Sequence, residues 1–168
     1  QIRHLVCACT GMPRQDLEWL FSSAKAPASS TFDQLAPMKP TSKFGEVFQY
    51  SNLMVSAGGY IAAAALMPGK DVGAAYDRAM QEQFFAPLGM TRTTFDFARA
   101  QRGNHASPHG DDFYGKTRIA DMGLNYTIIP ARPAGAVWTS PRDMSRWVLM
   151  ELNKGKTPEG KVLISEPN

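Results

Sequence analysis

The sequence predicts a mainly α-helical fold with few short strands, and three observations lead to this prediction. Apolar residues recur at helical spacing in two stretches, which begin at Asp71 and at Ser140. A third stretch, 54–66, is apolar and rich in alanine, while only residues 126–129 suit a short strand. At 168 residues, of which 43% are hydrophobic, the chain is long enough for one domain, 1–168, with its own core.

The N-terminal part predicts one short helix followed by a long loop. Pro13 is a helix-opening residue, and the pattern of Asp16–Phe21 predicts the helix. The stretch 22–43 is rich in Ser, Pro, Ala and Thr, which is typical of a loop. Cys7 and Cys9 are two positions apart, a spacing that strains a disulfide, so we interpret them as small buried hydrophobes.

The next predicted helix begins after Ser51, whose hydroxyl suits an N-cap, and runs through Leu66. Gly58 and Gly59 lie inside it, and each costs roughly 1 kcal/mol relative to alanine. Such a cost is tolerated where a neighbouring element packs against bare backbone. The glycine pair therefore predicts a close helix contact.

Two amphipathic helices complete the predicted elements. Asp71 caps the first, whose apolar repeat ends at the turn 87–90. Residues 91–133 are irregular and dense in Gly, Asp, Asn, His and Pro. The second helix has Ser140 as its N-cap, a proline in its first position and an acid in its third, and it ends at Gly155.

Charge and composition exclude several classes of function. The net charge is +3 with acidic and basic residues interleaved, so no basic stripe for nucleic acid is present. No apolar run is long enough for a membrane span. Two cysteines alone make neither a disulfide framework nor a zinc site, and we expect no metal and no cofactor.

Three patterns match functional motifs but lack the context that the chemistry needs. Gly110–Thr117 matches the phosphate-binding loop, yet neither a buried strand before it nor a helix after it is predicted. His105, His109 and the acids of 111–112 have metal-ligand spacing, but a solvated loop explains them better. Ser22 and Lys25 match Ser-x-x-Lys, although a loop sequence follows them and nothing buries the lysine.

Tyr50 and Asn52 are the candidate site residues with a suitable context. They follow a loop and stand at the start of an apolar helix. A tyrosine shuttles protons at neutral pH only if cations and a helix N-terminus stabilise its phenolate. The helix supplies the second condition, and the first needs a lysine from elsewhere in the fold. An asparagine carries both a donor and an acceptor, enough to hold a substrate amide.

Four stretches together resemble the middle portion of the serine β-lactamase-like family, which includes class C β-lactamases, penicillin-binding DD-carboxypeptidases and β-lactamase-like esterases. They are Ile2–Met12 (the family's "rHLLtHtSGl"), Phe48–Asn52 (Tyr-x-Asn), Pro87–Thr94 ("PLGM-x-x-T") and Pro133–Met144 ("paGGl-x-st-x-xDm"). They occur in the family's order, with Cys7, Cys9 and Ala136 as departures. The resemblance implies the helical lobe of the α/β serine β-lactamase and DD-peptidase fold.

The resemblance also implies the chemistry. Tyr50 would help to activate the nucleophile or protonate the leaving group, and Asn52 would contact the acyl side chain of the substrate. The family's Ser-x-x-Lys would precede Gln1 and its third motif would follow Asn168, so we expect a fragment that is inert alone. The parent would hydrolyse a β-lactam, a D-Ala-D-Ala peptide or an ester through an acyl-enzyme. The family favours a periplasmic or secreted location.

Two alternatives remain open on the sequence. In the first, the chain would be a non-catalytic ligand-binding module on the same scaffold. In the second, it would bind nucleotides at Gly110–Thr117. Compartment, oligomeric state and substrate class are not fixed by the residues.

Overall fold

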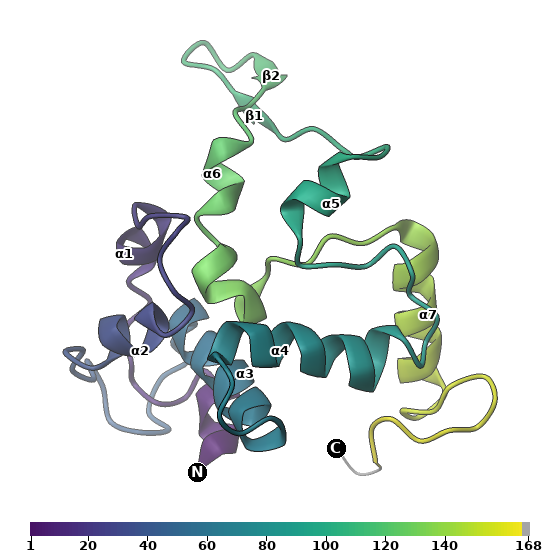
Figure 1. The fold of residues 1–168 in the computed structure, drawn as a ribbon. Helices are drawn as coiled ribbons and strands as arrows, with labels where there is room; N and C mark the ends of the chain where they lie inside the picture. Colours follow the sequence, from purple (N-terminus) through teal and green to yellow (C-terminus); the bar gives the residue numbers. More distant parts are fainter. Residues whose placement is uncertain (166–168) are drawn as a thin grey trace.

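The computed structural model describes residues 1–165, apart from the side chain of Leu124, and its fold is mainly helical (Figure 1). In the described part the helical segments are η1 (Ile2–Val6), α1 (Asp16–Leu20), α2 (Ser30–Leu35), α3 (Asn52–Leu66), α4 (Val72–Met80), η2 (Gln81–Phe85), α5 (Phe97–Gln101), α6 (Gly123–Tyr126), η3 (Ile129–Ala134) and α7 (Pro141–Leu152). Two short antiparallel strands, β1 (His109–Asp111) and β2 (Thr117–Ile119), pair with each other. The predicted fold class, mainly α with few short strands, is confirmed.

Helix α3 occupies the centre of the N-terminal half, where it contacts η1, α2, α4 and η3. Its N-cap is the predicted one, since the Ser51 hydroxyl accepts a hydrogen bond from the Met54 N–H at 3.4 Å. Leu53 and Tyr60 are fully buried on this helix. The helix is therefore held by tertiary packing along its length rather than by one apolar stripe.

Of the glycine pair of α3, Gly59 fulfils the predicted role of permitting a close contact. A Cβ on Gly59 would lie 2.6 Å from the Cβ of Pro133 in η3, a distance that packed carbon atoms do not reach. A Cβ on Gly58 would lie 3.4 Å from the Cβ of Leu5 in η1, which is ordinary contact. Gly59 thus permits the close approach of η3, and Gly58 faces η1 without such a need.

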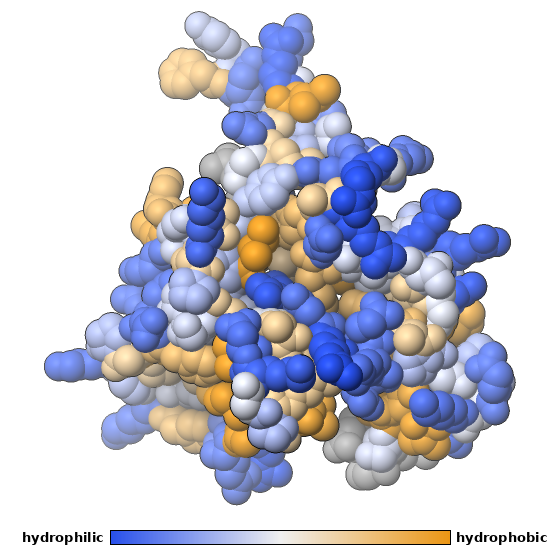
Figure 2. Space-filling view, viewed as in Figure 1, coloured by the Kyte–Doolittle hydropathy of each residue, from blue (hydrophilic) through white to orange (hydrophobic). Residues whose placement is uncertain are grey.

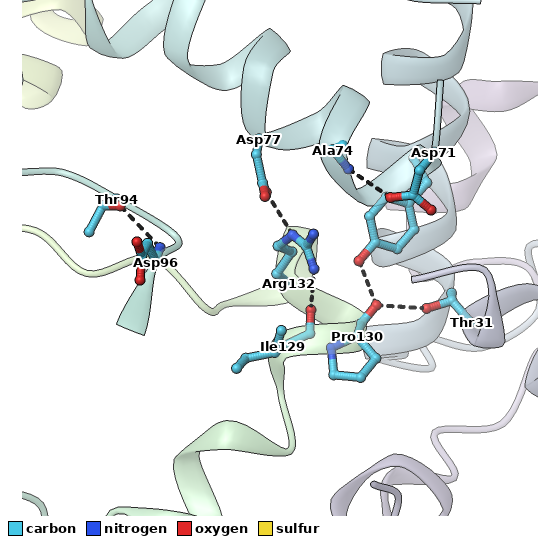
Figure 3. A network of polar contacts seen from close by, with 10 residues as sticks. Thr31, Asp71, Ala74, Asp77, Thr94, Asp96, Ile129, Pro130 and Arg132 are labelled. Carbon is cyan, nitrogen blue, oxygen red and sulfur yellow. Dashed lines mark hydrogen bonds and ion pairs between the residues drawn. The ribbon is translucent and has the colours of Figure 1, made fainter. Parts of the chain in front are cut away.

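A carbonyl of η3 joins three helices (Figure 3). The Thr31 hydroxyl of α2 donates to the Pro130 carbonyl at 3.4 Å, and the Tyr60 hydroxyl of α3 donates to the same oxygen. Burial raises the pKa of Tyr60, so this phenol stays protonated and keeps its donor. On the other side of η3, Nε of Arg132 donates to Asp77 of α4 at 2.6 Å.

A second core lies between η2 and α7. Phe85, Leu88, Met90 and Met150 are buried together there.

Beside this core, the buried carboxylate of Asp143 accepts hydrogen bonds from the Arg92 N–H at 2.7 Å and the Thr93 hydroxyl at 2.9 Å. The acid in the third position of α7 therefore anchors the turn that follows η2, a role beyond the helix cap that the sequence indicated.

Both remaining predicted caps are confirmed. The Asp71 carboxylate accepts from the Ala74 N–H at 3.0 Å, and the Ser140 hydroxyl accepts from the Asp143 N–H at 3.2 Å. Each of these bonds spans three residues, so local sequence determines it.

Three of the local predictions are wrong, and one of them is the irregular stretch 91–133, which contains α5, β1, β2, α6 and most of η3. The expected loop 22–43 contains α2, a short helix that carries the buried Thr31 to its long-range partner Pro130. The expected strand 126–129 consists instead of the end of α6, a turn at 127–128 and the start of η3. Pro130 has no N–H for a strand ladder, and its carbonyl is used by α2 and α3.

The interpretation of the cysteines is also wrong, because Cys7 and Cys9 form a disulfide. Ala8 between them has a left-handed backbone, with φ at 51°, which turns the chain back on itself. The two Cα atoms consequently lie 5.2 Å apart, within the ordinary range for a disulfide. Both cysteines are partly exposed rather than buried.

The strands β1 and β2 form a hairpin that stands away from the helices (Figure 1) and is exposed at every strand position. Figure 2 shows hydrophobic residues on this projecting, otherwise mostly hydrophilic hairpin. Phe113 at its tip is 97% exposed. No helix among residues 1–165 is long and apolar enough to cross a lipid bilayer.

The glycine pair provides a matched test of the α3 packing. Gly59→Ala forces a Cβ against Pro133, so we expect it to lower the free energy of unfolding by about 1 to 3 kcal/mol, the usual cost of overpacking. Gly58→Ala has room, so the better helix propensity of alanine should leave stability unchanged or raise it by up to about 1 kcal/mol. Urea unfolding measures both, and equal stabilities of the two variants would contradict the packing argument.

Candidate active site

Tyr50 and Asn52 lie where the sequence predicts, at the N-terminus of α3. Tyr50 precedes the cap residue and is 46% exposed, and Asn52 is the first residue of the helix. The segment that leads to them is tied to the N-terminal part of the chain by two backbone hydrogen bonds. The Gly45 N–H donates to the Cys9 carbonyl, and the Gln49 N–H donates to the Ala8 carbonyl, both at 2.8 Å.

The two candidate side chains contact each other directly. The Tyr50 hydroxyl donates to Oδ1 of Asn52 at 2.9 Å. Nδ2 of Asn52 in turn donates to Oδ1 of Asp16 at 2.9 Å. Both ends of the amide are thus engaged, which fixes its orientation and leaves one further hydrogen of Nδ2 and one lone pair of Oδ1 for another partner.

Asp16, the first residue of α1, is the anchor of this network. Its carboxylate also accepts from Nε1 of Trp19 at 3.0 Å and forms an ion pair with Arg14. Burial acts to raise the pKa of the Asp16 carboxyl, but the hydrogen bonds from Asn52, Trp19 and Arg14 outweigh it and hold the pKa below its usual range. Asp16 therefore remains a charged acceptor at neutral pH.

Arg14 supplies the positive charge beside the tyrosine. Its guanidinium carbon lies 5.4 Å from the centre of the Tyr50 ring, within the range of a cation–π contact. From sequence, the expected cation is a lysine from elsewhere in the fold. In the described part of the chain, the cation beside Tyr50 is this arginine, two residues before α1, and it contacts the ring while it is ion-paired with Asp16.

Tyr50 opens onto a cavity of about 210 Å³ between η1 and the start of α3. Its lining is mostly apolar and comes from two stretches of chain, 5–10 and 48–55. Ser51 contributes to this lining, but its hydroxyl is used by the helix cap and its side chain is buried. Ser51 is therefore a structural residue rather than a nucleophile.

The structure does not bring the Ser-x-x-Lys look-alike to the site. Ser22 and Lys25 lie in the turns between α1 and α2, and Lys25 is exposed. Neither residue lines the cavity at Tyr50. The pair lacks the helix that would place the lysine against the serine.

The metal-like cluster is also dispersed. Nδ1 of His105 contacts the Gly103 carbonyl and Nδ1 of His109 contacts the Ser107 carbonyl, both at 2.9 Å. Within the range 1–165, no group of three or more His, Cys, Asp and Glu side chains is arranged to hold a metal ion.

The stretch 110–117 forms the exposed hairpin and not a phosphate loop. Its turn is closed by Asp112, whose carboxylate accepts from the Tyr114 N–H at 3.0 Å and the Lys116 N–H at 2.9 Å. A phosphate loop needs its N–H groups directed at the ligand and a helix directly behind it. Here the N–H groups serve the turn, and an exposed strand follows.

Sequence reasoning missed Asp16, Arg14 and Trp19 as site residues. The sequence predicts Asp16 only as part of a short helix, and 36 residues separate it from Asn52. The sequence does carry one signal, because Asp16 begins a helix and has Arg14 and Trp19 close to it. This spacing indicates that the three side chains contact one another, but it does not indicate that Asn52 contacts Asp16.

Comparison with known proteins gives one family and several related folds. The family model described as Beta-lactamase matches residues 1–167. No curated protein sequence matches the chain significantly.

Three solved structures illustrate the related folds. A D-amino acid amidase from Ochrobactrum anthropi SV3, complexed with L-phenylalanine amide, is 21% identical with a TM-score of 0.66, over 90% of this chain and 43% of its own. The octameric penicillin-binding protein homologue from Pyrococcus abyssi is 20% identical with a TM-score of 0.70, over 97% and 36%. A beta-lactamase/D-alanine carboxypeptidase from Pseudomonas syringae is 22% identical with a TM-score of 0.62, over 96% and 40%. The chain thus spans less than half the length of these proteins.

Replacing the anchor should change the pH dependence of stability. Because the folded pKa of Asp16 is lowered, its contribution is present above the unfolded pKa of about 4 and is lost as pH falls through the folded value. We expect Asp16→Asn to cost about 1.5 to 3 kcal/mol at pH 7, the range for hydrogen bonds to a charged group. The difference from the wild type should shrink as the pH falls toward 3.

Urea unfolding between pH 3 and pH 7 measures this difference. Glu18→Gln, which removes an exposed carboxylate from the same helix, serves as the matched control and should change stability little at any pH. A constant deficit of Asp16→Asn across the whole range would contradict the assigned role of the charge.

Proposed function

The chain belongs to the Beta-lactamase family, and from this premise we propose that it forms the helical part of a serine hydrolase that works through an acyl-enzyme. The observation that carries the proposal is the chain of contacts from Tyr50 through Asn52 to Asp16. A phenol and an amide held together at a helix N-terminus, beside a cavity and under an arginine, are suited to proton transfer and substrate orientation.

In this proposal Tyr50 exchanges a proton with the nucleophile or the leaving group. Asn52 holds the acyl side chain of the substrate through the hydrogen and the lone pair that Tyr50 and Asp16 leave free. The nucleophilic serine with its lysine, and the third motif, would come from sequence outside residues 1–168. The share of the related structures that the chain covers, 36 to 43%, is consistent with this division.

The substrate class follows from the same reaction. An activated serine attacks a carbonyl, and β-lactams, D-Ala-D-Ala peptides and esters all present one. The fold is shared with an amidase and a carboxypeptidase, which adds D-amino acid amides to the substrates worth testing.

The competing function is ligand binding without turnover on the same scaffold. Ser22 and Lys25 lie between α1 and α2 and neither lines the cavity at Tyr50. The described residues therefore contain no Ser-x-x-Lys pair beside Tyr50, which favours this alternative for the isolated chain. The alternative predicts binding of a β-lactam or a D-amino acid amide by the full-length protein without its hydrolysis.

The decisive variant is Tyr50→Phe in the full-length protein. Loss of the hydroxyl removes the proton-transfer group, so we expect kcat to fall by about 10²- to 10⁴-fold. Stability should fall only slightly, because the side chain is half exposed and the variant loses a single hydrogen bond, to Asn52. A chromogenic cephalosporin, a p-nitrophenyl ester and a D-amino acid amide are the assay substrates.

Ser22→Ala is the matched control and should leave turnover unchanged. The isolated chain of 168 residues should be inert toward all three substrates. Turnover that survives Tyr50→Phe but is lost in Ser22→Ala would overturn the proposal.

A further inference from the structure

The disulfide between Cys7 and Cys9 closes one of the tightest covalent loops that a protein chain allows. It encloses a single residue, Ala8, whose φ of 51° lies in the left-handed region that side chains other than glycine rarely adopt. The Cys9 N–H points back at Sγ of Cys7, 3.2 Å away. The covalent ring therefore holds a backbone conformation that an alanine does not favour by itself.

The same turn supports the segment that presents Tyr50. Its two carbonyls, of Ala8 and Cys9, accept the hydrogen bonds from the Gln49 and Gly45 N–H groups, both at 2.8 Å. These contacts fix both ends of the stretch 45–49, and Tyr50 follows immediately. The orientation of the two carbonyls depends on the left-handed turn, so the disulfide acts on the loop through them.

The disulfide is also accessible. Both cysteines are partly exposed, and Cys7 and Ala8 line the cavity of about 210 Å³ that Tyr50 shares. The disulfide therefore lies at the wall of a cavity with room for a small molecule.

We propose that Cys7 and Cys9 form a redox-active site for thiol–disulfide exchange with dithiols, and that its oxidised form holds the Tyr50 loop in place. A thiolate of the dithiol attacks one sulfur and breaks the S–S bond, which gives a mixed disulfide and one cysteine thiol. The second thiol of the reagent then displaces the other cysteine. Two electrons and two protons pass to Cys7 and Cys9, and the reagent leaves as a disulfide.

Reduction releases Ala8 from its left-handed conformation. The two carbonyls then turn away from the Gln49 and Gly45 N–H groups, and the loop 45–49 loosens. Tyr50 loses its fixed position relative to Asn52, while α3, which is held by η3 and α4, keeps its place. The loss of hydrolysis on reduction rests on the function proposed above, but the loosening of the loop does not.

The experiment compares the oxidised and the dithiothreitol-reduced full-length protein. Alkylation with N-ethylmaleimide and peptide mass analysis count the free thiols at Cys7 and Cys9. Hydrogen exchange follows peptides that cover 45–50, with the α7 peptide as the internal reference. The double variant Cys7→Ser/Cys9→Ser is measured with and without dithiothreitol, and it should behave like the reduced protein in both cases.

We expect no label before reduction, two labels after it, and exchange at Gly45 and Gln49 that is faster by at least about tenfold in the reduced protein. Reoxidation should restore the slow exchange, which keeps the test valid even if the double variant does not fold. Two labels without reductant, or equal exchange of 45–50 in both states, would overturn the proposal. An equal rise in α7 would overturn it too, because the effect would then be global.

The exchange result also separates this inference from the proposed function. A loop that loosens on reduction in a protein without hydrolytic activity supports the redox site and contradicts the enzyme. If the loop 45–49 stays rigid on reduction in a protein that hydrolyses its substrates, the result contradicts the redox site and supports the proposed enzyme.

Discussion

The close approach of α3 and η3 at Gly59 is the constraint on which the site depends. Because Gly59 has no Cβ, Pro133 lies against the helix backbone. At this distance Ser56 and Tyr60, on the same helix, reach the carbonyls of Ala131 and Pro130. Three contacts within two helical turns leave α3 little freedom to shift or rotate, and the direction of its N-terminus is fixed with it.

The fixed N-terminus then needs support from outside the helix, because the candidate side chains lie at its exposed end. Asp16 holds Asn52 from the side of α1, through a charged hydrogen bond. The disulfide turn holds the preceding loop from the side of η1, through Gln49. The two supports differ in kind, since one depends on ionisation and the other on a covalent bond. Acidification and reduction consequently disturb the site at different places.

The elements that could be predicted from sequence are those set by local chemistry. The caps Ser51, Asp71 and Ser140 each bond an N–H three residues away, and the glycine pair marks a close contact without naming the partner.

The parts that could not be predicted depend on contacts between residues far apart along the chain. Thirty-six residues separate Asp16 from Asn52, and 99 separate Thr31 from Pro130. The disulfide depends on the backbone of Ala8, for which alanine carries no signal.

The direction of the hydrogen bonds decides what Tyr50 offers to an approaching group. Its hydroxyl donates to Asn52, so the phenol hydrogen is occupied and the oxygen lone pairs are free. An incoming donor, such as a serine hydroxyl or a lysine ammonium, meets an acceptor there. Asn52 keeps this polarity because Asp16 takes its amide hydrogen, which leaves the carbonyl oxygen facing the tyrosine. The charge of Asp16 thus orients the Tyr50 hydroxyl through Asn52, and with it the lone pairs that an incoming donor would meet.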